Sequence, residues 1–238
     1  MRRLRALERR GTALHFKEHF LTSLFSDQTS SGAPEGVARI ADIMASYPGR
    51  WSLCGGWAVD AWLGRVSREH GDIDLSVFVE DQRALHDHLA GWQLLAHDAA
   101  WEPGRGDQWW DGTRRLGCPS HIHARPPERA GEMPKDGIAT LEDGFLLDIQ
   151  INDLEGDAWL LSRLPAITLG FERAVQQSPW GMPTASPEVV LFFKARDLRR
   201  RDKVDFAALL PLLSAEQRAW LKEAVVALGH PWVRELSV

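Results

Sequence analysis

The sequence predicts an α/β (α+β) fold with a helical C-terminal region. Segments in which apolar residues alternate, at 72–79 and 145–151, are separated by segments with helical spacing. Beyond about residue 165 the apolar pattern becomes mostly helical. With 238 residues, 44% of them hydrophobic, the chain is long enough to bury a core of its own.

Residues 1–35 are predicted to form an N-terminal arm and linker. The arm begins with several arginines, and residues 27–34 are rich in Ser, Gly and Pro, which is typical of a linker. The arginine-rich start lacks the apolar core of a secretory signal, so we expect a cytoplasmic protein. No run of about 18 uncharged apolar residues occurs, and the sequence therefore predicts no membrane span.

The predicted core domain, residues 36–160, opens with a helix and a glycine turn. Apolar positions between residues 35 and 46 recur at helical spacing. A short apolar run at 51–54 is followed by Gly55-Gly56 and then by an apolar stretch up to Gly64. This order predicts a strand, a glycine turn and a helix that ends at Gly64.

Residues 72–79 predict a half-buried strand. Its apolar positions alternate with Asp72, Asp74 and Ser76, so both aspartates point to the same side. A short helix is expected over 82–90. The stretch 97–135, rich in Gly, Pro, Trp and charge, is expected to form hairpins and loops.

A third acid lies on the next predicted strand, Phe145 to Ile151. Asp148 is isolated among apolar residues there, which favours a functional role over a solvent-facing one. Asp143 and Asp153 are weaker substitutes, because each lies closer to a predicted strand end.

The glycine turn and the aspartate pair make chemical sense as a unit. Two carboxylates on one strand face can hold a divalent metal against a triphosphate. A glycine turn lets backbone N–H groups approach the phosphates. The set is therefore typical of nucleotidyl transfer.

The stretch from Cys54 to Leu75 resembles the aminoglycoside nucleotidyltransferase group of the polymerase-beta-like nucleotidyltransferase superfamily. In that group a Gly-Gly turn is followed by Arg-x-[Ser/Thr]-Arg-x-His-x-Asp-[Ile/Leu]-Asp. The matching residues here are Arg65, Ser67, Arg68, His70, Asp72, Ile73 and Asp74. The resemblance implies a mixed-sheet nucleotidyltransferase domain.

The resemblance also implies roles for these residues. Asp72 and Asp74 would ligate Mg²⁺, and Asp148 would either ligate metal or deprotonate the acceptor hydroxyl. Four residues would receive the nucleotide phosphates, namely Gly55, Gly56, Arg68 and His70. Alternatively, Arg68 and His70 support the strand edge or orient the carboxylates.

The C-terminal region, residues 161–238, resembles the helical part of uncharacterised members of the same group. Ser186-Pro187-Glu188 predicts a helix start, with a capping hydroxyl and a proline in the first turn. Lys194 lies in line with Val190 and Leu198 on the inward face, where it can meet phosphate; alternatively it extends to solvent. Arg199, Arg200 and Arg201 are expected to form a solvated charged face.

Together these features predict an enzyme that transfers a nucleoside monophosphate, AMP from ATP, to a hydroxyl of a small molecule. An aminoglycoside-like antibiotic would be such an acceptor, which would make the protein an antibiotic-resistance enzyme. Residues 91–143 match almost nothing in the group and are expected to shape the acceptor pocket. The alternatives are nucleotidylation of a protein or tRNA, as in toxin-like relatives, and a non-catalytic nucleotide-binding module.

Other features exclude some partners. The net charge of -5 argues against general nucleic-acid binding, which needs a broad cationic surface.

His121 and His123 are spaced like a metal-binding pair, but no third ligand follows, so a surface strand is the simpler interpretation. Cys54 and Cys118 are expected to be free thiols. Tryptophans such as Trp101, Trp109 and Trp110 are expected mainly in the core or in a lid. The oligomeric state is not indicated.

Overall fold

A computed structural model describes residues 32–98, 107–134, 139–140, 143–162, 164, 167–196 and 199–237. Most of the predicted arm, Trp101 and Leu198 lie outside these ranges. The chain divides into two compact units, Met1–Ser46 and Tyr47–Val238. In the first unit, helix α2 (Glu35–Met44) confirms the first predicted helix.

The second unit contains short strands interspersed with helices. Its strands are β1 (Trp51–Leu53), β2 (Ile73–Phe78), β3 (Gln93–Asp98), β4 (Gln108–Trp109), β5 (Ser120–Arg125), β6 (Leu147–Glu155), β7 (Ala158–Leu160), β8 (Thr168–Gly170), β9 (Val175–Gln177) and β10 (Pro183–Ala185). Its α-helices are α3 (Gly55–Leu63), α4 (Gln82–His88), α5 (Phe171–Ala174), α6 (Pro187–Lys194), α7 (Arg200–Leu209) and α8 (Ala215–Ala227). Single 3-10 turns are η1 (Val79–Asp81), η2 (Pro127–Arg129), η3 (Leu210–Leu212), η4 (Pro231–Val233) and η5 (Glu235–Ser237).

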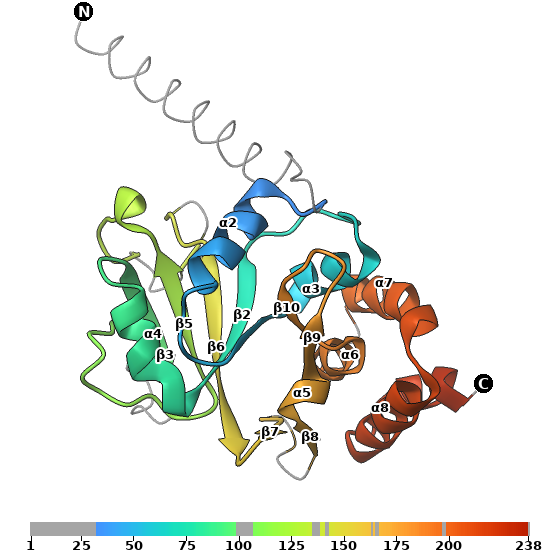
Figure 1. Ribbon diagram of the computed structural model, residues 1–238. Helices are drawn as coiled ribbons and strands as arrows, with labels where there is room; N and C mark the ends of the chain where they lie inside the picture. Colours follow the sequence, from blue (N-terminus) through green and yellow to red (C-terminus); the bar gives the residue numbers. More distant parts are fainter. Residues whose placement is uncertain are drawn as a thin grey trace, which may run out of the picture. The chain divides into compact units, whose positions relative to one another are not determined.

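The strands form a mixed sheet, as predicted. Its order within the described residues is β4-β3-β5-β6-β2-β1-β10-β9. Strand β2 runs parallel to β6 and antiparallel to β1, while β5 runs antiparallel to β6. Figure 1 shows α4 beside β3, with α6, α7 and α8 at the end of the sheet where β10 and β9 lie. The predicted helical C-terminal region is present, whereas the domain boundary near residue 160 stays a prediction.

The two faces of the sheet differ in character. On one face Leu75 of β2 is paired with Ile149 of β6, which is paired with Ile122 of β5, and none of the three is exposed to solvent. The opposite face carries two rows of polar residues that cross the strands. The first row is Asp74, Asp148 and His123, and the second is Ser76, Gln150, His121 and His97. The first row belongs to the candidate site.

The strand predicted over 72–79 is present as β2, but it is buried on both faces, so the expectation that it is half-buried is wrong. Ser76, on the polar face, exposes only 3% of its surface, and Phe78 exposes none. Alternation predicts which residues share a face, but not whether the polar face is covered by other elements.

Two further regions differ from the predictions. The antiparallel pairs of β3 with β4 and with β5 agree with the hairpins expected in this stretch, but β5 lies inside the sheet, between β3 and β6. His121 and His123 therefore do not lie on a surface strand. Beyond residue 165, β8, β9 and β10 precede the long helices, and β10 joins the sheet beside β1. Each of these is three residues long, which is too short for a periodic signal.

Helix ends follow local chemistry. Gly64 ends α3 in a left-handed conformation, as predicted, and its N–H bonds back to the carbonyl of Ala61. Ser186 and Pro187 open α6, also as predicted, but the Ser186 hydroxyl makes no capping hydrogen bond.

Both cysteines are free thiols, as expected. Among the described residues, no helix has the length and apolar character needed to cross a membrane.

Candidate active site

Three carboxylates meet at one end of strands β2 and β6. Asp74 and Asp148 are register partners in this parallel pair, and Asp72 lies directly before β2. One oxygen atom of each carboxylate lies within 4.8 Å of the others. The sequence predicted these acids as one site, and the fold brings them together.

Burial and mutual repulsion favour the protonated forms of two of these acids. Burial raises the pKa of Asp74 to about 7, and the charge of Asp72 adds to the effect. Burial, followed by the charges of Asp74 and Asp72, raises the pKa of Asp148 well above its usual range. A bound cation would remove this cost by stabilising the ionised forms.

The donor set suits a hard divalent cation. All three ligand atoms are carboxylate oxygens, which Mg²⁺ prefers. The buried Oδ1 of Asp148 has no hydrogen-bond partner in the described part of the chain. An orphaned buried oxygen of this kind is costly unless a ligand satisfies it.

The glycines allow helix α3 to begin against the carboxylates. Gly55 has φ 64°, and a Cβ atom built there would overlap the carboxylate of Asp74. A Cβ on Gly56 would overlap the ring of His70. The N–H of Gly56 hydrogen-bonds to Asp74 and holds it in place. Glycines are therefore required in this turn, because the backbone lies too close to Asp74 and His70 to accommodate a side chain.

His70 is held inside the protein by a buried acid of α3. Its Nε2 lies 2.6 Å from Oδ2 of Asp60, and its side chain is 4% exposed. Its ring lies 4.2 Å from that of Trp57 at a tilted angle, and the Ser67 hydroxyl donates to the other oxygen of Asp60. These contacts tie His70 to helix α3; nucleotide contact stays a prediction, as do the alternative roles of supporting the strand edge or orienting the carboxylates.

Arg68 and Lys194 share one buried acid of α7. Arg68 Nη2 lies 3.0 Å from Asp205, and Lys194 Nζ lies 2.6 Å from the same carboxylate oxygen. Burial alone would raise the pKa of Asp205, but the two cations outweigh it and hold that pKa below its usual value. Lys194 points inward as predicted and its side chain is only 10% exposed, so the alternative that it extends to solvent is wrong.

A cavity of about 780 Å³ contains the three acids and the two glycines. Its basic lining residues are Arg68, Lys194, Arg196, Arg199 and Arg201. Arg199 and Arg201 are exposed, as expected of a solvated face, yet both also line this cavity. We call it the donor cavity.

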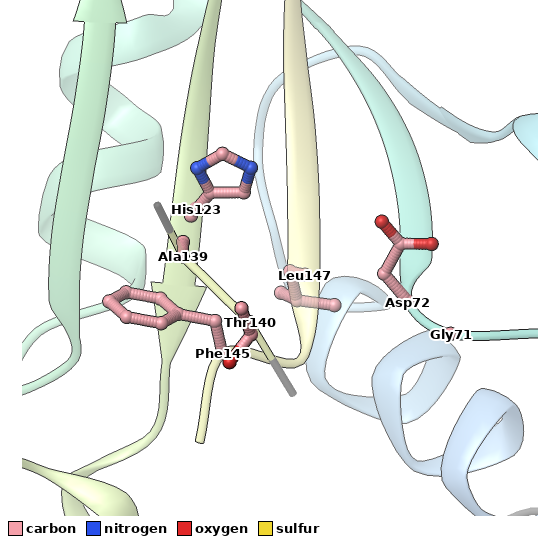
Figure 2. Close-up of a pocket in the computed structure, with 7 residues that line it drawn as sticks. All are labelled: Gly71, Asp72, His123, Ala139, Thr140, Phe145 and Leu147. Carbon is pink, nitrogen blue, oxygen red and sulfur yellow. The ribbon is translucent and has the colours of Figure 1, made fainter. Parts of the chain in front are cut away.

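A second cavity, of about 550 Å³, lies on the β5 side of the acids (Figure 2). Its lining residues are Gly71, Asp72, His123, Ala139, Thr140, Phe145 and Leu147. Gly71 and Asp72 line both cavities, so the two meet at the first acid of the cluster. We call it the β5 cavity.

The sequence missed Asp60 and Asp205, which hold the basic residues in place. A signal existed for each. Asp60 is an isolated acid in the apolar helix that follows the glycine turn. Asp202 and Asp205 share the inward stripe of α7 with Phe206 and Leu209, at helical spacing.

The two substitute acids lie elsewhere. Asp153 is exposed on β6, beyond the part that pairs with β2, and is instead paired with Leu160 of β7. Asp143 accepts a hydrogen bond from the Thr140 hydroxyl in the turn before β6. Neither belongs to the carboxylate cluster, which favours Asp148 as the third acid.

One protein family matches part of the chain. The model of the aminoglycoside-2''-adenylyltransferase family matches residues 36–108, which include the glycine turn and the first two acids. This match confirms the resemblance found in the sequence, and the predicted enzyme class is that of the matching family. No curated protein matches the chain.

Solved structures of antibiotic-modifying enzymes are similar to the chain. ANT(2")-Ia in complex with adenylyl-2"-tobramycin has a TM-score of 0.50 at 16% identity, covering 81% of this chain and 96% of its own. A solution structure of ANT(2'')-Ia has 0.49 at 18%, covering 80% and 89%. The lincosamide antibiotic adenylyltransferase LnuA, with lincomycin bound, has 0.48 at 20%, covering 79% and 100%. At 16% identity, the likeness to the first concerns the fold alone.

Proposed function

We propose that this chain is a Mg²⁺-dependent nucleotidyltransferase that transfers AMP from ATP to a hydroxyl of an antibiotic-like small molecule. The observation that carries the proposal is the cluster of three carboxylates within 4.8 Å, beside a helix that begins with two glycines. The family match over residues 36–108 supports the same chemistry.

In this proposal Asp72, Asp74 and Asp148 hold the metal. Bound Mg²⁺ would neutralise charge on the reacting phosphate and lower the pKa of the attacking hydroxyl. Burial and the neighbouring acids raise the pKa of Asp74 and of Asp148, so a cation placed among the three carboxylates would stabilise their ionised forms.

The donor cavity is proposed to bind the triphosphate. Its basic side chains complement the phosphate charges. The glycines at the start of α3 bring the first backbone N–H groups of this helix close to the carboxylate cluster, at the end of the helix that favours anions. Asp205 keeps Arg68 and Lys194 in place before the nucleotide arrives.

The transfer is an in-line displacement. The acceptor oxygen forms a bond to the α-phosphorus, the bond between the α-phosphorus and the bridging oxygen breaks, and pyrophosphate leaves. If Asp148 serves as the base instead of the third ligand, its Oδ1, which has no partner in the described residues, takes the proton of the hydroxyl; with Asp148 as a ligand, that proton passes to water.

The test is to incubate the protein with α-³²P-labelled ATP, Mg²⁺ and a panel of aminoglycosides, lincosamides and small RNAs. We expect label in a small molecule. Asp72→Asn and Asp74→Asn should each lower transfer about 10³-fold, because they remove several kcal/mol of transition-state stabilisation.

The matched control is Asp153→Asn, which changes an exposed acid on β6 outside the cluster. It should retain normal transfer. Full activity in both Asp72→Asn and Asp74→Asn would show that the metal ligands are wrongly assigned, and label in RNA would point to a macromolecular acceptor.

A further inference from the structure

The β5 cavity differs chemically from the donor cavity. Among its described lining residues, Asp72 is the single carboxylate, and it already belongs to the acidic cluster. Phe145, Leu147 and Ala139 supply apolar wall, while His123 and Thr140 supply neutral polar groups. The cavity therefore offers little to a ligand that carries several positive charges.

A buried cation lies behind the aromatic wall. The guanidinium of Arg125 lies 4.7 Å from the ring centroid of Phe145 and 5.2 Å from that of Trp109. Its hydrogen-bond acceptors in the described ranges are uncharged oxygens, from the Gln93 side chain and the backbone of Gly131, Glu132 and Asp143. Because this charge is buried and already occupies a face of Phe145, it disfavours a second cation on the same ring.

His123 connects this cavity with the acids. It is the register partner of Asp148, one strand further from Asp74, and neighbouring strands lie roughly 4.8 Å apart. Figure 2 shows His123 on β5 and Asp72 at the start of β2, on either side of β6. A hydroxyl bound by the imidazole would thus lie next to the carboxylate cluster.

The surroundings of His123 leave one ring nitrogen for a ligand. Its Nδ1 is buried, makes no hydrogen bond with the described residues, and lies 3.9 Å from Oδ2 of Asp107. The other oxygen of Asp107 lies 2.9 Å from the ring of His97, which holds the carboxylate in place. In the tautomer that carries its proton on Nδ1, toward the Asp107 carboxylate, Nε2 is the hydrogen-bond acceptor.

We propose that the β5 cavity binds the acceptor as an uncharged hydroxyl compound with an apolar face, whose hydroxyl donates to Nε2 of His123. The apolar face would pack on Phe145 and Leu147. This inference rests on the proposed function, because it assigns the acceptor of that same reaction. A sugar hydroxyl next to an aromatic group has the required chemistry.

The acceptor class is tested with three glycosides and one polycation. Phenyl β-D-glucopyranoside carries the apolar face, its 4-aminomethyl derivative adds one positive charge, and methyl β-D-glucopyranoside lacks the ring. We expect kcat/KM for transfer of AMP to the phenyl glycoside to exceed that of each other compound, tobramycin included, about tenfold. Equal or better transfer to tobramycin overturns the inference, as does absence of transfer to the phenyl glycoside.

The role of His123 is tested by substitution. His123→Leu should raise KM for the phenyl glycoside about tenfold, as expected for one lost hydrogen bond of about 1.4 kcal/mol, and leave KM for ATP unchanged. His123→Gln, which can place a polar atom near the position of Nε2, should recover part of the loss. A purely structural role would instead raise both KM values or lower the melting temperature, without recovery by Gln.

The control is His121→Leu. His121 lies on the same strand and the same face but does not line the β5 cavity. It should leave KM for the glycoside unchanged. An unchanged KM in His123→Leu, or an equal rise in His121→Leu, overturns the assignment of His123.

A separate measurement distinguishes failure of this inference from failure of the proposed function. Slow release of pyrophosphate from ATP and Mg²⁺, with water as the acceptor, should occur in the wild type and disappear in Asp72→Asn. If it does so while the phenyl glycoside is inert, only the acceptor assignment fails. If no pyrophosphate is released with any acceptor, the proposed function fails and the inference with it.

Discussion

The two cavities that meet at Asp72 are built on different principles. The donor cavity is rich in basic side chains, and buried acids of α7 hold several of them. The β5 cavity has aromatic and aliphatic walls, a histidine and, in its described lining, no acid of its own beyond the shared one. In the donor cavity, charged side chains would bind the nucleotide. In the β5 cavity, apolar packing and hydrogen bonds would bind the acceptor.

The family match covers only part of each cavity. It includes the glycine turn and the first two acids but ends at residue 108, before β5, β6 and the basic residues of the C-terminal helices. The match therefore concerns the junction of the two cavities, whereas the remaining walls have to be understood from their own residues.

The largest effect is expected from Asp205→Asn, which breaks the charge balance of the donor side. Its side chain is 1% exposed and pairs with Arg68 and with Lys194, itself nearly buried. Removing one partner from a buried ion pair leaves an uncompensated charge, so we expect a loss of about 3 kcal/mol in the free energy of unfolding. Urea denaturation measures it.

The control for Asp205→Asn is Asp157→Asn, which removes the exposed partner of Arg50. An ion pair of this kind contributes less than about 1 kcal/mol. Similar losses in both variants would show that the buried network around the donor cavity has no special importance for stability.

A smaller effect is expected from Arg125→Lys on the acceptor side. A lysine keeps the charge but cannot reproduce the planar fork that serves four oxygens at once. Leaving these part-buried oxygens without a donor should lower the free energy of unfolding by about 2 kcal/mol. Denaturation at low and high salt checks the cause, since the loss should be the same in both. A strong salt dependence would contradict a hydrogen-bonding role.

The last prediction concerns pH and metal at the junction of the cavities. Because the folded protein raises the pKa of Asp74 from 3.8 to about 7, it binds more protons than the unfolded chain between these values. Without metal, stability should therefore fall as pH rises through that window. Mg²⁺ needs the ionised form, so its stabilising effect should grow with pH by up to about 1.4 kcal/mol per unit.

Thermal unfolding at pH 5.5 and 7.5, with and without Mg²⁺, tests this coupling. Asp74→Asn should reduce the pH dependence in both conditions, and Asp148, whose pKa burial also raises, should retain the remainder. A stabilisation by Mg²⁺ that is equal at the two pH values would contradict the assignment of Asp74 as a metal ligand.

The sequence predicts the centre of the molecule better than its rim. Strand β1, helix α3 and strand β2 follow from alternation, a glycine turn and Gly64, which are all local signals. The proximity of Asp74 and Asp148 was also predictable, because it requires only that β2 and β6 lie side by side with their polar residues on the same face of the sheet.

The remaining features depend on contacts that leave no local pattern. Strand β10 is three residues long, and its pairing with β1 is set by the fold. The ion pairs of Asp205 join α7 to Arg68 and Lys194, which are distant in sequence or on another helix. In β5, His121 and His123 alternate with apolar residues. These histidines make the sequence of the strand look like that of a polar loop, so the sequence alone did not indicate an internal strand.

The alternation along β5 separates two tasks within a single strand. Ile122 and Ala124 face the apolar side and support the sheet, while His121 and His123 face the polar side. Substitutions at positions 121 and 123, unlike changes at Arg125, would therefore alter the polar face without removing apolar core residues. A lineage under selection by a new compound would have in these two positions a short route to altered selectivity that leaves the acids and the donor cavity unchanged.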